Sequence, residues 1–203
     1  MNSPNVVVFP FTWAEPKSAD THLAEKMCAS LRHAEQRFDR KPIIVQMASM
    51  ESKALPFVDV VHRVKMDNFG EWYFECMASL PYWDFLRLDH DIIMRLPPWE
   101  VFDHHFDIAV AKEHKGMMNN GVVFVRNKAF FTYALEVYRN RTTRNDWNDI
   151  QVATQLAIDD GVFRVRKIDP NVYNCIPDRA DGVHPDAKIV HFKDERKEWM
   201  LAA

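Results

Sequence analysis

The chain has 203 residues, a formal net charge of −3 and 47% hydrophobic residues. This length suits a single domain with one sizeable core, and we expect one domain over residues 1–203. The charge excludes a global basic field that would draw nucleic acid or an anionic membrane, so only local basic patches stay open.

Apolar runs and helical patterns alternate in the first half of the chain. Strands are predicted at Val6 to Phe9, Ile43 to Val45, Val58 to Val64 and Phe85 to Asp89. A helix is predicted from Ser18, a suitable N-cap, to about Phe38, because apolar residues recur on one face. A second helix is predicted over Glu71 to Leu80 and ends before Pro81.

The second half of the chain continues the alternation. Strands are predicted at Ile108 to Ala111, Gly121 to Val125, Phe163 to Ile168 and Ile189 to Phe192. Helices are predicted at Pro97 to Glu100, Asn127 to Arg141 and Asp146 to Asp160, the last of them ended by Gly161. Because many strands are apolar on both faces, we expect an α/β fold with a mostly parallel central sheet flanked by helices.

The triplet Asp89-His90-Asp91 follows the apolar run Phe85 to Leu88 directly. A buried strand rarely ends in two carboxylates, because each resists leaving water unless it is paired or bound to a metal. On an extended backbone Asp89 and Asp91 point to the same side, so they are candidate oxygen ligands for Mg²⁺ or Mn²⁺. The alternation turns His90 to the other face, and we expect it to be a surface residue. A polar turn with two helix-capping acids is an equally good interpretation of the triplet alone.

His191 is the best candidate for a third protein ligand of this metal. It stands at the end of another predicted strand, and open α/β sheets bind ligands at the carboxyl ends of their strands. Lys193, Arg196 and Lys197 follow and supply cations for a phosphorylated ligand. The competing interpretation is a histidine that is simply hydrogen-bonded within its own neighbourhood.

Two further groups of polar residues are candidates for sugar contacts. Asn119-Asn120-Gly121 offers a pair of amides before a strand, although the same residues are typical of an ordinary turn. Asp149 and Gln151 stand near the start of a predicted helix beside Trp147. They either line a pocket or form the first helical turn, where a negative charge is favoured anyway.

The remaining features concern compartment and partners. Cys28, Cys76 and Cys175 are odd in number and far apart, which indicates reduced core thiols rather than a disulfide framework. No signal peptide and no membrane-spanning run is recognisable, so we expect a cytoplasmic protein without a membrane span. Arg139, Arg141 and Arg144 form either a local basic patch or, more simply, a solvated helix end.

Taken in order, the four polar motifs resemble those of the GT-A fold glycosyltransferases. The greatest likeness is to the glycogenin and lipopolysaccharide galactosyltransferase group. The D-x-D of that group corresponds to Leu88 to Asp91, and its N-[ST]-G before a strand corresponds to Asn119 to Phe124. Its acidic residue with glutamine at a helix start corresponds to Asp149 to Gln151, and its H-x-x-G-x-x-K-P-W to His191 to Trp199. Asn120, Ile150, Asp194 and Glu198 depart from the pattern. Asp194 replaces a glycine, and its carboxylate would repel a diphosphate unless it were turned away.

The resemblance implies a metal-dependent transfer from a nucleotide-diphosphate sugar, a UDP-sugar above all, with retention of anomeric configuration. Mn²⁺ (or Mg²⁺) would be held by Asp89, Asp91 and His191, with Lys197 as a second cation on the phosphates. Asn119, Gly121, Gln151 and Thr12 would contact the donor. Asn120 and Asp149 would orient the sugars, and Asp149 would be the base if the enzyme inverts.

Several alternatives stay open. The acceptor is a glycan, a protein or a modified base in DNA, and the sugar, the nucleotide base and the oligomeric state are not fixed. A nucleotidyltransferase or sugar-nucleotide hydrolase is less favoured. Such nucleotidyltransferases usually carry a glycine-rich basic loop after the first strand, and here Pro10-Phe11-Thr12-Trp13 stands instead. A non-catalytic domain that binds a sugar nucleotide or a glycan is the third possibility.

Overall fold

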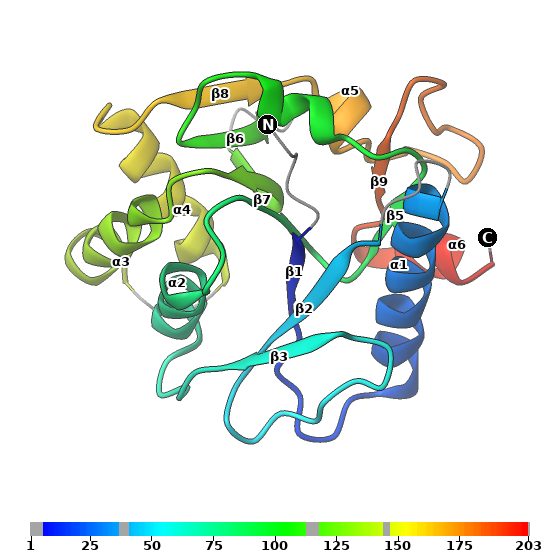
Figure 1. Cartoon of the computed structure of the whole chain (residues 1–203), viewed down its shortest axis with the longest axis horizontal. Coiled ribbons are helices and arrows are strands. Elements are labelled where there is room, and N and C mark those ends of the chain that lie inside the picture. The colour runs from blue at the N-terminus through cyan, green and yellow to red at the C-terminus, as the bar shows by residue number, and fades with distance from the viewer. Residues whose placement is uncertain (1–5, 37–40, 113–117, 144–146, 203) are drawn as a thin grey trace.

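The computed structural model describes residues 6–36, 41–112, 118–143 and 147–202. Its centre is a seven-stranded sheet in the order β3-β2-β1-β4-β7-β6-β8 (Figure 1). The strands are β1 (Val6–Pro10), β2 (Ile43–Ala48), β3 (Val60–Arg63), β4 (Phe85–Leu88), β6 (Ile108–Lys112), β7 (Met118–Val125) and β8 (Val165–Ile168). β7 pairs antiparallel with β4 and β6, while the other pairs are parallel. The expected mostly parallel α/β sheet is therefore confirmed.

The sheet separates two hydrophobic cores, since alternate residues of one strand enter opposite layers. In β1, Val7 and Phe9 join one core, and Val6 and Val8 join the other. α1 (Ser18–Gln36) packs in the first core. α2 (Phe69–Ser79), α3 (Ala129–Arg141) and α4 (Trp147–Asp159) pack in the second. Figure 1 shows these two groups of helices on opposite sides of the sheet.

Local sequence explains where these helices lie. In α1 the residues Leu23, Met27, Leu31 and Ala34 recur at helical spacing and are all buried. Asn68 caps α2 by accepting a hydrogen bond from the backbone N–H of Glu71 at 3.1 Å. The predicted ends at Phe38 and Asp146 lie outside the described residues.

A second, two-stranded sheet was not predicted from the sequence. β9 (Ile189–His191) pairs antiparallel with β5 (Ile92–Met94) rather than joining the central sheet. β9 lies within the strand predicted at Ile189 to Phe192, whereas the three residues of β5 leave too little pattern to recognise. The same holds for the short helices α5 (Pro170–Tyr173) and α6 (Lys197–Ala202) and for the 3₁₀ turn η2 (Asp194–Arg196). The predicted helix at Pro97 to Glu100 is the 3₁₀ turn η1 (Trp99–Asp103).

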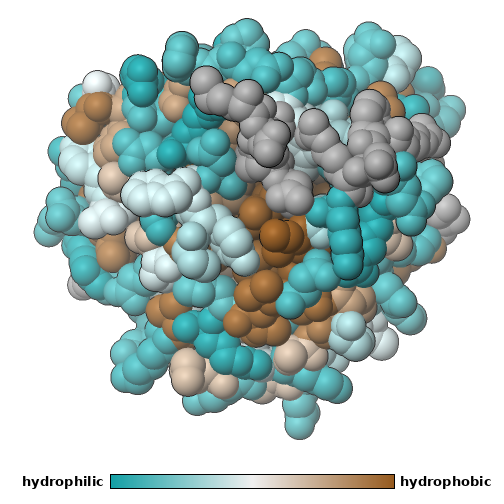
Figure 2. All heavy atoms as spheres, in the orientation of Figure 1, coloured by the Kyte–Doolittle hydropathy of each residue, from teal (hydrophilic) through white to brown (hydrophobic). Residues whose placement is uncertain are grey.

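No helix in the described ranges is long and apolar enough to cross a bilayer. Arg139 forms ion pairs with Glu71 and Glu75, and Arg141 pairs with Asp160, so these two arginines lie on a charge-balanced face. Arg144 lies outside the described residues. The face drawn in Figure 2 has a mainly hydrophilic rim around an apolar area in the region of β1, β2 and β3.

Candidate active site

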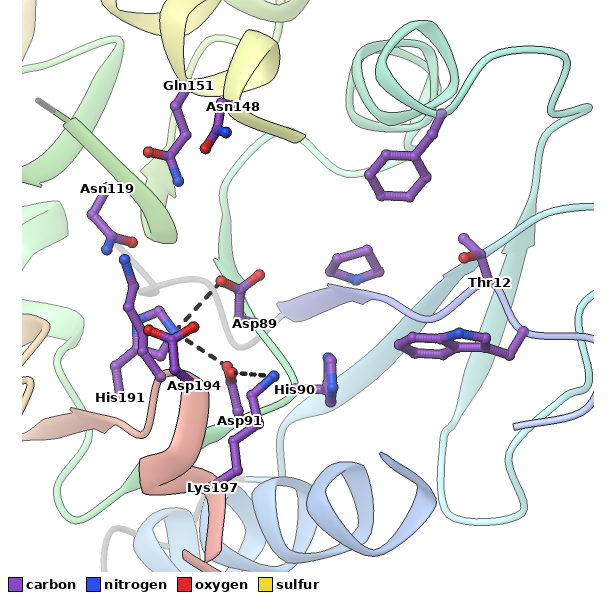
Figure 3. Close-up of a pocket in the computed structure, with 14 residues that line it drawn as sticks. Thr12, Asp89, His90, Asp91, Asn119, Asn148, Gln151, His191, Asp194 and Lys197 are labelled. Carbon is purple, nitrogen blue, oxygen red and sulfur yellow. Dashed lines mark ion pairs between the residues drawn. The ribbon is translucent and has the colours of Figure 1, made fainter. Parts of the chain in front are cut away.

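A pocket of about 750 Å³ opens where β1 and β4 end. Ligands of α/β sheets bind at this end of parallel strands. Its lining residues come from segments spread over the chain (Figure 3): Pro10, Thr12, Trp13, Phe69, Asp89, His90, Asp91, Asn119, Asn148, Gln151, His191, Lys193, Asp194 and Lys197. Seven of the ten site residues predicted from the sequence are among them.

Asp89, Asp91 and His191 converge on one wall of the pocket. The Nε2 atom of His191 lies 3.6 Å from Asp89 Oδ2 and 3.2 Å from Asp91 Oδ1. One potential ligand atom from each residue lies within 4.8 Å of the others, so the three could hold a metal ion. Asp89 to Asp91 form a turn between β4 and β5, and not the extended strand end that the sequence suggested.

The pairing of β5 with β9 brings His191 to this turn. His191 lies directly opposite Ile92, the residue that follows Asp91. The backbone N–H of Phe192 also donates to the carbonyl oxygen of Asp91 at 2.9 Å. The convergence of the three side chains therefore depends on the small sheet rather than on the central one.

Asn174 fixes the orientation and the tautomer of His191. Nδ1 of the imidazole lies 3.0 Å from Asn174 Oδ1, which can only accept a hydrogen bond. Nδ1 therefore carries the proton, and in the neutral ring the lone pair of Nε2 faces the carboxylates. A metal-ligating histidine typically donates its other N–H to such a partner. Nothing in the sequence around Asn174 indicated this role.

Asp91 is buried, at 6% exposure, and its Oδ1 has no hydrogen-bond partner among the described residues. Where the His191 ring is neutral, Nε2 has no proton to give Asp91, and the lone pairs of the two atoms face each other. A cation between the two atoms, either a proton or a metal ion, satisfies both. Burial raises the pKa of Asp91, but His191, His90 and Lys197 outweigh burial and hold it well below its usual range.

Gly121 makes room for the imidazole. A β-carbon at this position would lie 2.7 Å from Asn119 Oδ1 and closer still to Cε1 of His191. The residues around it lie in β7, where the pairing with β6 shifts register next to Val110. The interpretation of Asn119-Asn120-Gly121 as an ordinary turn is therefore wrong. Such a bulge beside a site commonly redirects side chains.

Arg87 connects the Asp89–Asp91 turn to this bulge. It is fully buried in β4, its Nη2 lies 2.7 Å from Asp89 Oδ1, and its Nη1 donates to the Asn120 carbonyl oxygen. Its guanidinium also lies 5.2 Å from the ring centre of Tyr73. Burial lowers the pKa of Arg87, but Asp89 and Tyr73 raise it further, so the charge is kept. Arg87 is a charged residue inside an otherwise apolar strand, and this signal was not recognised when Phe85 to Leu88 was interpreted as an apolar run.

The opposite wall of the pocket is aromatic. It consists of Pro10, Thr12, Trp13, Phe69 and His90. The Trp13 and His90 rings meet edge to face with their centres 5.5 Å apart. The expectation that His90 is a surface residue turned away from its neighbours is wrong, because its side chain is only 14% exposed and lines the pocket. The turn at residues 89–91, in place of a strand, explains the difference.

The remaining predicted residues divide between the pocket and its supports. Asn119, Gln151, Thr12 and Lys197 line the pocket. Asn120 instead faces α4, where its amide donates to Thr154 Oγ1 at 3.1 Å. Asp149 accepts a hydrogen bond from Thr143 Oγ1 at 2.7 Å and is not among the lining residues. Asn148, one residue earlier in α4, lines the pocket and was not predicted. The functional roles of all these residues stay predictions.

The segment after β9 carries charged residues to the same pocket. Lys197 Nζ lies 3.2 Å from Asp91 Oδ2, and Lys193 and Asp194 also line the pocket. Asp194 has a backbone φ of 55°, in the left-handed region. Asp194, whose carboxylate we expected to repel a diphosphate unless it were turned away, therefore lines the pocket on a left-handed backbone.

No protein-family model matches the sequence, and no curated protein matches it. Solved structures match in fold. GlyE, a glycosyltransferase of Streptococcus pneumoniae TIGR4, has a TM-score of 0.66 at 15% identity, over 98% of this chain but only 56% of its own. A glycosyltransferase involved in glycosylation of the major capsid of PBCV-1 has a TM-score of 0.64 at 18% identity, covering 98% and 100%.

The galactosyltransferase LgtC has a TM-score of 0.64 at 10% identity, covering 94% of this chain and 87% of its own. An inositol-1-phosphate CTP transferase from T. maritima has a TM-score of 0.58 at 12% identity, covering 98% and 96%. At these identities the likeness concerns the fold, and it confirms the GT-A fold expected from the sequence.

Proposed function

We propose that this chain is a metal-dependent glycosyltransferase that takes a sugar from a nucleotide-diphosphate sugar, a UDP-sugar above all. The observation that carries the proposal is the convergence of His191 Nε2 with the carboxylates of Asp89 and of the buried Asp91, whose Oδ1 lies 3.2 Å from Nε2. These three side chains lie on the wall of a pocket large enough for a nucleotide sugar.

The donor set fits a divalent cation. Two carboxylates and one imidazole suit Mn²⁺ well and Mg²⁺ acceptably, and a set of three protein ligands leaves positions for phosphate oxygens. Such an ion, when bound, would neutralise charge on the diphosphate leaving group. Asn174 would keep the Nε2 lone pair of His191 available to the ion, and Lys193 and Lys197 add positive charge to the pocket lining.

The aromatic residues of the pocket suit the nucleobase of such a donor, and its amides suit the sugar. Trp13, at 39% exposure, and Phe69 offer rings on which a nucleobase can stack. Asn119, Asn148 and Gln151 offer amides that both donate to and accept from sugar hydroxyls. The solved neighbours support the same class, since LgtC was solved in complex with donor and acceptor sugar analogues.

The transferred sugar needs an acceptor, and a glycan, a protein or a modified nucleobase are the candidates. Nucleotidyl transfer is the second candidate function, because the CTP transferase from T. maritima shares the fold over nearly all of both chains. The segment after β1 favours the first function. Phe11 is buried and its N–H donates to the Met47 carbonyl oxygen, so this segment is no glycine-rich phosphate loop.

A ligand screen on the full chain tests the proposal. We expect the melting temperature to rise with a nucleotide sugar plus Mn²⁺, since a hundredfold excess over Kd adds about 2.7 kcal/mol. Turnover should release a nucleoside diphosphate, whereas a nucleotidyltransferase would release pyrophosphate. Binding without any turnover on a broad acceptor panel would favour the non-catalytic alternative.

Asp91→Asn tests the metal centre within the same screen. We expect it to abolish the Mn²⁺-dependent shift and to lower transfer at least about a hundredfold, because even indirect supports of a metal ligand are worth 10- to 100-fold. Asp178→Asn, at an exposed aspartate outside the pocket, is the matched control. Full transfer by Asp91→Asn in saturating Mn²⁺ would rule out the proposed metal centre.

A further inference from the structure

We propose that Asp194 discriminates between the intact sugar donor and the spent nucleoside diphosphate, and so limits inhibition by the product. The proposal rests on the proposed function, because it assigns a task to a residue of the same pocket. Its starting point is the backbone of Asp194, whose φ of 55° is the only positive φ at a non-glycine residue in the described ranges.

This conformation is one that glycine adopts freely and that other residues adopt seldom, Asp and Asn more readily than the rest. Asp194 opens η2, which closes with the N–H of Arg196 donating to the Lys193 carbonyl oxygen at 3.1 Å. A glycine would form the same turn without strain. Strained residues gather at functional sites, so the retained side chain points to a use for the carboxylate.

The position of Asp194 indicates what that use is. Three carboxylates line the pocket, those of Asp89, Asp91 and Asp194, together with the ammonium groups of Lys193 and Lys197. Asp89 and Asp91 belong to the group of candidate metal ligands, and Asp194 does not. Figure 3 shows Asp194 on the His191 side of the pocket. Its carboxylate therefore adds a negative charge to the pocket lining without being a candidate ligand of the ion.

Transfer changes the charge at this end of the donor. The bond from the sugar to the phosphate oxygen breaks, and its electron pair stays on that oxygen. The acceptor oxygen bonds to the sugar, and its proton passes to water. The released diphosphate carries up to one more negative charge than the donor, because its terminal phosphate ionises near neutral pH. A carboxylate accepts hydrogen bonds from sugar hydroxyls but repels that additional charge.

Two substitutions separate charge from backbone strain. Asp194→Asn keeps the shape and tolerates a positive φ but carries no charge, and Asp194→Gly removes both the charge and the strain. Glu195→Gln is the matched control, because Glu195 is the next residue, is exposed and does not line the pocket. It loses the same net charge in the same turn.

The experiment measures Kd by calorimetry on the full chain in Mn²⁺, with UDP and GDP and with their glucose and galactose conjugates. For both Asp194 variants we expect the diphosphate to bind roughly three- to tenfold tighter, and the sugar conjugate to gain less or to weaken. The difference should shrink in high salt, where exposed charges are screened. Glu195→Gln should leave both Kd values unchanged.

Each result decides a different point. If diphosphate and conjugate shift by the same factor, or if Glu195→Gln shifts them as Asp194→Asn does, the role of Asp194 is overturned while the proposed function stands. If wild-type protein binds none of these ligands with Mn²⁺, the proposed function falls and this inference falls with it.

Discussion

His191 Nε2 and Asp91 Oδ1 lie 3.2 Å apart, and the hydrogen bond from His191 Nδ1 to Asn174 leaves the neutral ring without a proton between them. A cation placed between these two buried atoms, either a proton or a metal ion, is therefore stabilised. This relationship makes the geometry around His191, rather than the carboxylates alone, the feature to test.

Asn174→Ala should weaken Mn²⁺ binding about 10- to 100-fold, because the imidazole loses the partner that sets its tautomer and orientation. The buried Nδ1–H would also lose its acceptor, which should lower the free energy of unfolding by about 1–3 kcal/mol. Calorimetric titration with Mn²⁺ measures the first effect. Asn171→Ala, at an exposed residue of the short helix α5 that Asn174 caps, is the control. Equal Mn²⁺ affinity in Asn174→Ala and wild type would contradict the assigned tautomer.

Gly121→Ala should displace His191, since the added methyl group would overlap the imidazole and Asn119 Oδ1. We expect weaker Mn²⁺ binding and a loss of about 1–3 kcal/mol in stability. Gly161→Ala provides the contrast. Gly161 has a φ of 71° with open space around its α-carbon, so that variant should lose stability through backbone strain and keep its Mn²⁺ affinity. Unchanged Mn²⁺ affinity in Gly121→Ala would show that the ring needs no such space.

Trp13→Ala should weaken nucleotide binding by about 1 kcal/mol or more, which is about fivefold in Kd, if the ring stacks on the base. Trp83→Ala is matched in chemistry, because Trp83 is 72% exposed and does not line the pocket. Calorimetry compares the binding of the same nucleotide to both variants and to wild type. A greater loss in Trp83→Ala would place the base elsewhere.

Asp107 predicts an acid-dependent loss of stability outside the pocket. It accepts hydrogen bonds from the Arg164 backbone N–H at 2.7 Å and from the Asn127 amide at 3.2 Å. Burial raises the pKa of Asp107, but the hydrogen bonds from Arg164 and Asn127 outweigh burial and hold it below the usual 3.8. A carboxyl group whose pKa is lower in the folded state stabilises the fold above its unfolded pKa, and that contribution is lost as the pH falls through the folded pKa.

Asp107→Asn should therefore lower the free energy of unfolding at neutral pH. The difference in the free energy of unfolding between Asp107→Asn and wild type should narrow as the pH falls below the usual pKa of 3.8. Urea unfolding at a series of pH values measures this difference. A difference that stays constant over that range would show that the ionised carboxylate contributes nothing.

Much of the central sheet could be predicted from the sequence, because its strands are buried on both faces and appear as apolar runs. Val6 to Phe9 became β1 with one more residue, and the helix predicted at Asn127 to Arg141 begins at Ala129. The antiparallel direction of β7 and the separate sheet of β5 and β9 could not be predicted. Strand direction and partners depend on tertiary packing, which local periodicity does not record.

The candidate metal centre was predictable because charged or ionisable residues end apolar runs there. Asp89, Asp91 and His191 each stand at the end of such a run, and the structure brings them together. Arg87 and Asn174 acquire their importance from contacts with Asn120 and His191, far away in sequence. His90 was predicted to face away from Asp89 and Asp91, as it would on an extended strand. These residues form a turn instead, and the side chains of a turn do not alternate between two faces.

The small sheet of β5 and β9 has a consequence for how this chain resists proteolysis. It joins segments about a hundred residues apart in sequence, and two short strands alone hold together weakly in water. An ion bound by Asp89, Asp91 and His191 would act as a removable cross-link between these segments and close a long loop, which limits the freedom of the unfolded chain. Protection of the segment from Ile189 to Trp199 against a protease should then rise and fall with the supply of metal.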